Sequence, residues 1–147
     1  MVKACDANSL AWTTAGFSIA AQTYYVYDAA KTITASLATQ TKACGYAVSY
    51  AILVQTTFAA ADSTVFTLTS GTPNTISIAT NLFSKAGTYN LVYRASMTNL
   101  RTPTPVVTLD ATFTVTIIDR CATTSFNIAQ PTINTMATTA LSVTSHT

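Results

Sequence analysis

Residues 112–118 alternate between threonine and large apolar side chains, in the order Thr112-Phe113-Thr114-Val115-Thr116-Ile117-Ile118. In an extended chain, successive side chains point to opposite faces. The three apolar side chains before Ile118 therefore share one face, and the threonines share the other. This period of two predicts a β-strand with one face in a hydrophobic core and the other toward solvent.

Two longer stretches show the same alternation. Residues 89–95 and residues 46–54 each place their large apolar side chains on one face. Shorter strands are predicted at residues 17–20, 24–27, 32–37, 65–69 and 75–80, where β-branched and aromatic residues are frequent. Helical periodicity is nearly absent, so the sequence predicts an all-β domain.

Turn residues separate these strands. They gather at residues 70–74, 85–87 and 101–105, which contain glycine, proline or both. The first of these segments is expected to join two short strands as a five-residue hairpin. Seven or more short strands with regular turns are typical of a sandwich with Greek-key connections.

The end of the predicted domain resembles a known family. Residues 87–93 read Gly87-Thr88-Tyr89-Asn90-Leu91-Val92-Tyr93, and a proline-containing loop leads to the strand that ends at Asp119. This arrangement is similar to the last two strands of immunoglobulin-like and cadherin-like repeat modules of extracellular fibrous or surface proteins. The resemblance implies an immunoglobulin-like Greek-key β-sandwich of about seven to nine strands, with Tyr89 as the corner tyrosine whose hydroxyl binds nearby backbone.

The chain departs from true immunoglobulin domains in two places. The strand of Tyr89 contains no cysteine, and Trp12 lies near the N-terminus rather than on the third strand. The core disulfide and the core tryptophan of that family are therefore not expected here.

The chain contains an odd number of cysteines, Cys5, Cys44 and Cys121. In an extracellular protein, an odd count indicates a free thiol or a partner outside the chain. In the topology that the resemblance implies, Cys5 and Cys44 lie at one end of the sandwich and Cys121 at the other. A Cys5–Cys44 disulfide is then favoured, which leaves Cys121 over. A Cys44–Cys121 disulfide and buried thiols stay open as alternatives.

We divide the chain into a sandwich module, residues 1–120, and a segment that follows it, residues 121–147. This segment is expected to begin a second repeat, or to act as an assembly tail that adds as a donor strand to a neighbouring sandwich. Its candidate assembly residues are Phe126, Ile128 and Ile133, whose side chains have no obvious core of their own.

The repeat interpretation depends on the position of Cys121. When Cys121 is laid on Cys5, Leu10 falls on Phe126, so that apolar residues coincide. Residues 1–5 lack the apolar region of a signal peptide. We therefore expect the chain to be a processed or excerpted piece of a longer protein.

The composition favours a structural role outside the cell. Charged residues make up 8% of the 147 residues, glutamate is absent, and the net charge is +2. Threonine and serine together occupy roughly 30% of positions. Because charge normally keeps molecules apart in solution, such a surface suits contact with identical copies or adjacent repeats, or a cover of O-linked glycans. Bacterial pilins that polymerise by strand donation have a similar composition.

Other partners are not expected. The basic residues are few and scattered, which is unlike a nucleic-acid-binding protein. No apolar run approaches the roughly 20 residues of a membrane span.

The residues of catalytic and metal sites are sparse. The single histidine, His146, lies next to the last residue, where chains seldom hold an imidazole in place. The five aspartates are dispersed, and Asp119 is an isolated candidate for calcium, which needs several oxygen ligands. We therefore expect no enzyme activity, no cofactor and no bound metal.

The tyrosines of residues 24–27 are candidates for a contact with another molecule. Their rings are expected on both faces of one strand, and a strand that is apolar on both faces is normally covered on both. Tyr25 and Tyr27 are therefore candidate contacts between copies, or a platform for stacking a carbohydrate. The sequence thus favours a self-assembling structural subunit of an extracellular filament or surface appendage. The alternative is an adhesin or a carbohydrate-binding surface module.

Overall fold

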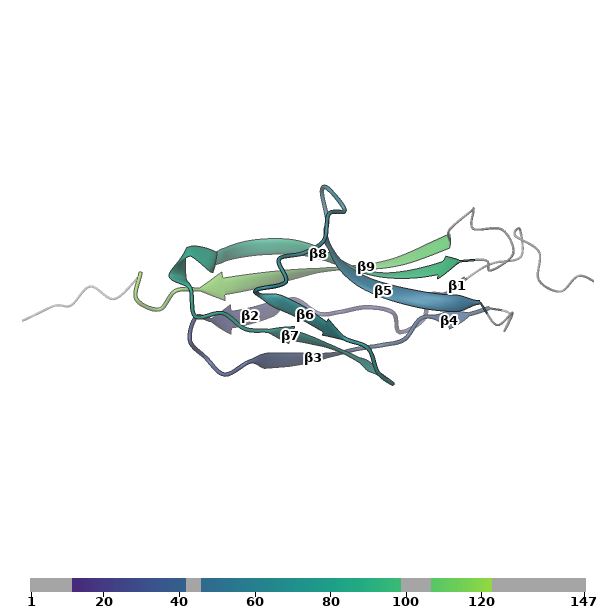
Figure 1. Cartoon of the computed structure of the whole chain (residues 1–147), viewed down its shortest axis with the longest axis horizontal. Coiled ribbons are helices and arrows are strands. Elements are labelled where there is room, and N and C mark those ends of the chain that lie inside the picture. Colours follow the sequence, from purple (N-terminus) through teal and green to yellow (C-terminus); the bar gives the residue numbers. More distant parts are fainter. Residues whose placement is uncertain (1–11, 42–45, 99–106, 123–147) are drawn as a thin grey trace, which may run out of the picture.

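The computed structural model describes residues 12–41, 46–98 and 107–122 (Figure 1). These residues contain nine strands and a 3-10 helix, Phe83–Lys85. The strands are β1 (Trp12–Thr13), β2 (Gln22–Tyr25), β3 (Lys31–Ala35), β4 (Thr39–Gln40), β5 (Ala47–Val54), β6 (Phe66–Thr69), β7 (Asn74–Ile78), β8 (Gly87–Thr98) and β9 (Val107–Ile118).

The strands form two packed sheets and a small additional pair. One sheet has the order β2-β9-β8-β5, the other has the order β3-β7-β6, and β1 pairs with β4. Only β2 and β9 run parallel among these pairs. The orders β5-β8-β9 and β3-β7-β6 are those of the C-F-G and B-E-D strands in the immunoglobulin fold. The predicted all-β immunoglobulin-like Greek-key sandwich is therefore confirmed.

The core lies between the two sheets and follows the predicted alternation. In β9, Phe113, Val115 and Ile117 are buried, and in β8 so are Leu91 and Tyr93. The facing sheet contributes mainly Ile76, Ile78 and Phe66 to the same cluster. A register that sets Tyr89 beside Val115 keeps the apolar face of both long strands toward this core.

A buried polar group fixes the hairpin between β6 and β7. Asn74 is 1% exposed, and its side-chain amide donates to the Tyr93 hydroxyl at 2.8 Å. The amide oxygen of Asn74 accepts from the backbone N–H of Gly71 at 2.9 Å. Burial raises the pKa of Tyr93, whose ring stacks on Phe17 and Tyr50. The predicted hairpin, whose residues 70–74 lie between the paired Thr69 and Thr75, thus has its own anchor in the core.

The prediction of a strand at residues 17–20 is wrong. Phe17 and Ile19 are buried as alternation requires, but residues 14–21 form no strand. This segment connects β1, which pairs with β4, to β2, which pairs with β9 in the four-stranded sheet. Because this segment crosses between two sheets, its backbone forms the regular hydrogen bonds of neither sheet. Its side chains still enter the core.

The long axis of the sandwich separates two ends. β8 and β9 contain 12 residues each, which corresponds to about 40 Å at the usual rise of a strand. The first described strand, β1, lies at one end, and β9 finishes at the opposite end (Figure 1). The described chain therefore enters and leaves the module at opposite ends.

Candidate functional site

Three large apolar side chains are exposed at the end where β9 finishes. Tyr27 is 65% exposed, Leu82 is 51% exposed and Phe83 is 45% exposed. The rings of Tyr27 and Phe83 meet edge to face, with 5.2 Å between their centroids. We call these three residues, together with Arg120, the exit-end surface. A group of exposed apolar side chains is typical of an interaction site, whereas single ones are ordinary.

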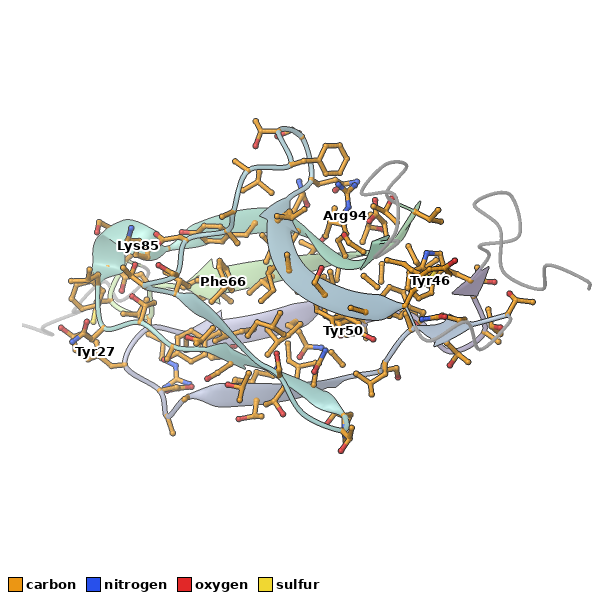
Figure 2. The ribbon with its side chains drawn as sticks, turned by 45° about the vertical axis from the view of Figure 1, so that its right-hand side comes forward. Tyr27, Tyr46, Tyr50, Phe66, Lys85 and Arg94 are labelled. Carbon is orange, nitrogen blue, oxygen red and sulfur yellow. The ribbon has the colours of Figure 1, made fainter. Side chains whose placement is uncertain are left out.

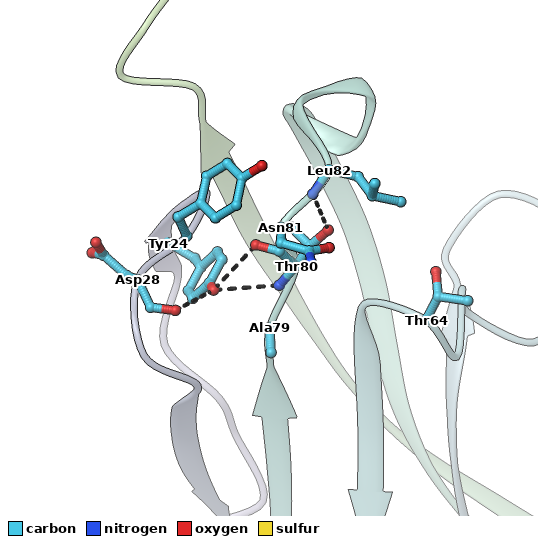
Figure 3. Close-up of a pocket in the computed structure, with 8 residues that line it drawn as sticks. Tyr24, Asp28, Thr64, Ala79, Thr80, Asn81 and Leu82 are labelled. Atoms are coloured by element: carbon cyan, nitrogen blue, oxygen red, sulfur yellow. Dashed lines mark hydrogen bonds between the residues drawn. The ribbon is translucent and has the colours of Figure 1, made fainter.

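A pocket of about 460 Å³ lies within this surface (Figure 3). Its walls come from the turn after β2, from the segment after β7 and from the loop before β6. The lining residues are Tyr24, Tyr27, Asp28, Thr64, Ala79, Thr80, Asn81 and Leu82. The volume falls within the range of small-molecule pockets.

The buried Tyr24 joins two walls of the pocket. Its hydroxyl donates to the carbonyl oxygen of Asp28 at 2.7 Å and accepts from the backbone N–H of Thr80 at 3.3 Å. The backbone N–H of Tyr27 donates to the carbonyl oxygen of Thr80 at 3.1 Å. Tyr27 itself has a φ of 71°, in the left-handed region that residues other than glycine adopt rarely. These bonds hold the turn after β2 in the conformation that exposes the Tyr27 ring.

Arg120 fixes the chain just after β9. Its guanidinium carbon lies 4.2 Å from the centre of the Tyr25 ring, and its Nη2 donates to a carboxylate oxygen of Asp28 at 3.2 Å. The backbone N–H of Cys121 donates to the Asp119 carboxylate at 2.7 Å. The direction in which residues 119–121 leave the sandwich is therefore set by side-chain contacts rather than by a strand.

An ion pair holds the helical turn that carries Phe83. Lys85 Nζ lies 2.6 Å from Asp62 Oδ2, and the Thr64 hydroxyl donates to Asp62 Oδ1 at 2.6 Å. The bond from Lys85, followed by those from Thr64, lowers the pKa of Asp62 from 3.8 to about 2. The carboxylate of Asp62 in turn raises the pKa of Lys85.

Tyr89 stabilises the same region from β8. Its hydroxyl donates to the carbonyl oxygen of Lys85, four residues upstream, at 2.8 Å. Its ring meets Phe66 edge to face, with 5.2 Å between the centroids. The turn before β8 is thus tied to the start of the strand that follows it.

The residues predicted from the sequence are only partly described. Tyr25 and Tyr27 both lie at the exit end, but β2 ends at Tyr25, so the two rings do not share one strand face. Cys121 is exposed just beyond β9. The remaining predicted residues lie outside the described part of the chain, namely Cys5, Cys44, Phe126, Ile128 and Ile133.

Leu82, Phe83 and Arg120 were not among the residues predicted from the sequence. Leu82 and Phe83 are adjacent apolar residues between a strand and a turn. Because they lie outside any strand, their side chains are not turned toward the core by strand alternation. Two adjacent apolar residues outside a predicted strand were the signal in the sequence that could have indicated this exposed surface. Arg120 gave none, because its partner Asp28 is 92 residues away along the chain.

The two ends of the module carry different aromatic residues. Figure 2 shows Tyr27 at the exit end and Tyr46 at the opposite end. The backbone carbonyl of Tyr46 accepts from the side-chain amide of Gln40 at 3.0 Å, beside the pair of β1 and β4. Cys121 therefore lies far from both Tyr46 and Trp12, the described residues nearest to the other two cysteines in the sequence.

Within residues 12–41, 46–98 and 107–122, no three histidine, cysteine or acidic side chains gather as a metal site would require. No helix in the same part of the chain is long and apolar enough to cross a membrane.

Comparisons with known proteins add little. No protein-family model matches the chain, and no curated protein matches it. One similar solved structure is a chain from the crystal structure of the titin M10–obscurin-like 1 Ig complex, which is 14% identical. That match covers 67% of this chain and 86% of the other, with a TM-score of 0.38. The order of the strands shows an immunoglobulin-like fold.

Proposed function

We propose that this module is a structural unit of an extracellular filament or surface appendage, and that it assembles end to end with identical copies or adjacent repeats. The observation that carries the proposal is the position of the exit-end surface. Its exposed apolar residues, Tyr27, Leu82 and Phe83, lie at the end of the sandwich where β9 delivers the chain. A following unit would meet this surface first.

The path of the described chain supports a linear array. β1 and the end of β9 lie at opposite ends of the long axis (Figure 1), so successive units add length. Arg120 fixes the departing chain against Tyr25 and Asp28, which limits the angles that a following unit can adopt.

The tail keeps its two predicted roles. Residues 121–147 begin the next repeat, or they add as a donor strand to a neighbouring sandwich. In the first case Cys121 pairs with a cysteine of the following unit, and the Cys5–Cys44 disulfide locks the present one. Phe126, Ile128 and Ile133 then contact the neighbouring unit.

The extracellular location rests on composition and on the outer face of β9. Thr108 and Thr112 are exposed there, and Thr114 and Thr116 are half-buried. Such a row of hydroxyls is suited to O-linked glycans, which would replace the missing charge as a means of keeping filaments soluble.

A second candidate function is the binding of a carbohydrate. The exposed ring of Tyr27 stands beside the polar side chains of Asp28 and Asn81 at the pocket. An aromatic face with nearby hydrogen-bonding groups is suited to a sugar ring. This function would make the module an adhesin rather than a filament unit.

The two functions are separated by two matched variants. Leu82→Asp places a charge in the exit-end surface, and Phe58→Asp places the same charge at a side chain of similar exposure, 50% against 51%. We expect Leu82→Asp to reduce self-association at least tenfold in sedimentation velocity and Phe58→Asp to leave it nearly unchanged. Equal effects of the two variants would contradict the proposal. Retained glycan binding by a monomeric protein, lost in Tyr27→Ala, would favour the adhesin.

A further inference from the structure

The edge strand β5 has an unusual composition for an exposed edge. Among the described strands it pairs only with β8, and its eight residues read AVSYAILV, with no charge, no proline and no glycine. Proteins commonly protect such edges with lysine, proline or very short strands. The other edges of the described sheets follow that rule. β6 has four residues, and Lys31 of β3 donates from its Nζ to the carbonyl oxygen of Thr23 in β2 at 3.0 Å.

The C-terminal part of β5 is covered by the chain itself. Ala61 donates its N–H to the carbonyl oxygen of Ile52 at 3.0 Å, and Val54 donates its N–H to the carbonyl oxygen of Ala59 at 2.8 Å. These bonds show that the backbone groups of the even-numbered residues point away from β8. In an antiparallel pair the alternate, odd-numbered residues then bond to β8.

Within the part of the chain that the structure describes, the N-terminal part of β5 is open between two covered positions. On one side, the carbonyl of Tyr46 accepts from the Gln40 side chain. On the other, the carbonyl of Ile52 accepts from Ala61. Between them the outward N–H and C=O groups of Val48 and Tyr50 have no backbone partner within the described residues. We call residues 47–51 the open edge.

The open edge is self-complementary. Ser49 is its centre, and the covered positions Tyr46 and Ile52 are equally far from it along the strand. If a second copy is placed antiparallel about a two-fold axis at Ser49, Val48 lies opposite the second Tyr50, and Tyr50 lies opposite the second Val48. Residues that lie opposite each other and both point toward the partner exchange two hydrogen bonds per pair. All four open groups of each copy are then satisfied.

The side chains allow this approach. Ala47 and Ser49 are exposed and small, and Ala51 is half-buried, so the outer face of the open edge carries no bulky or charged side chain at these positions. We propose that the open edge binds the open edge of a second copy, forming an isologous contact centred on Ser49 that joins two four-stranded sheets into one. This lateral contact uses no residue of the exit-end surface and stands independently of the proposed function.

The contact is tested by charge at the two-fold axis. In Ser49→Lys two ammonium groups would face each other, which destabilises a strand pair. The matched control is Thr67→Lys, which places the same charge at an exposed position of the edge strand β6. We expect the full chain to dimerise in sedimentation equilibrium, Ser49→Lys to weaken the dimer at least tenfold and Thr67→Lys to leave it within about twofold.

Cross-linking tests the register. Residues in a non-hydrogen-bonded antiparallel pair have Cα atoms about 4.5 Å apart, within reach of a disulfide. In Ser49→Cys, mild oxidation is expected to give a covalent dimer in which mass spectrometry finds the two introduced thiols joined to each other. Thr67→Cys is expected to give no such dimer. A natural chain that stays monomeric, a Ser49→Cys variant that forms no such cross-link, or equal cross-linking of both variants would overturn the proposal.

Discussion

The guanidinium of Arg120 lies over the ring of Tyr25, 4.2 Å from its centre, and also donates to Asp28 at 3.2 Å. Tyr25 ends β2 and Arg120 follows β9, and these two strands run parallel. The contact therefore connects the last described segment of the chain to the strand beside it. It lies next to the pocket, to which Asp28 also contributes.

Replacing Arg120 is expected to loosen the arrangement of successive units with little effect on the stability of each. Exposed ion pairs and cation–π contacts contribute about 1 kcal/mol or less each. In a tandem chain of two copies, Arg120→Gln should broaden the distribution of interatomic distances measured by small-angle X-ray scattering. Arg94 makes the same two kinds of contact, with Phe58 and Asp110, so Arg94→Gln is the control and should leave that distribution unchanged.

Tyr89→Phe removes one hydroxyl and keeps the ring against Phe66. The lost bond to the carbonyl of Lys85 should lower the free energy of unfolding by about 1 kcal/mol. Chemical denaturation of the two proteins measures the difference. Tyr27→Phe, at a mostly exposed ring, should change it by less than about 0.5 kcal/mol. An equal loss in both variants would show that the bond of Tyr89 contributes nothing specific.

Asn74→Ala should be more harmful, because Asn74 is buried and its amide serves two partners. The substitution leaves the N–H of Gly71 without its acceptor and the hydroxyl of Tyr93 without its donor. A loss of about 2–3 kcal/mol in the free energy of unfolding is expected. The exposed Asn81 provides the comparison, and Asn81→Ala should stay within about 0.5 kcal/mol of the natural chain.

The Asp62–Lys85 pair should stabilise the folded state only at a pH where the Asp62 carboxylate is charged. The folded state lowers the pKa of Asp62 from 3.8 to about 2, so it favours the charged carboxylate. This contribution is fully present above about pH 4 and is lost as the pH falls toward 2. The melting temperatures of the natural chain and of Asp62→Asn should therefore converge across that window. A constant difference from pH 6 to pH 2 would contradict this assignment.

Much of the fold was predictable because alternation is a local signal. Phe113, Val115 and Ile117 pointed to the core from the sequence alone, and the structure buries all three. The parallel pairing of β2 with β9 was not predictable in this way, because it joins residues that lie far apart in the sequence, such as Gln22 and Val115. Phe17 misled the prediction, since a segment that crosses between sheets can bury alternate side chains without forming a strand.

The candidate site was less predictable than the fold. Tyr25 and Tyr27 were singled out as a strand face, yet Tyr27 lies in a turn with a left-handed conformation. Its neighbour Phe83 comes from a helical turn 56 residues later in the chain. Surfaces that are assembled from turns have no period in the sequence, so only the structure brings their residues together.

Electron microscopy of the native assembly in negative stain, without reducing agent, tests the central proposal most directly. Units stacked end to end should appear as regular fibres with an axial repeat of about 4 nm, the length of the 12-residue strands. Leu82→Asp should shorten or abolish these fibres, whereas Phe58→Asp should not. Dispersed single particles of the natural protein under the same conditions would contradict end-to-end assembly.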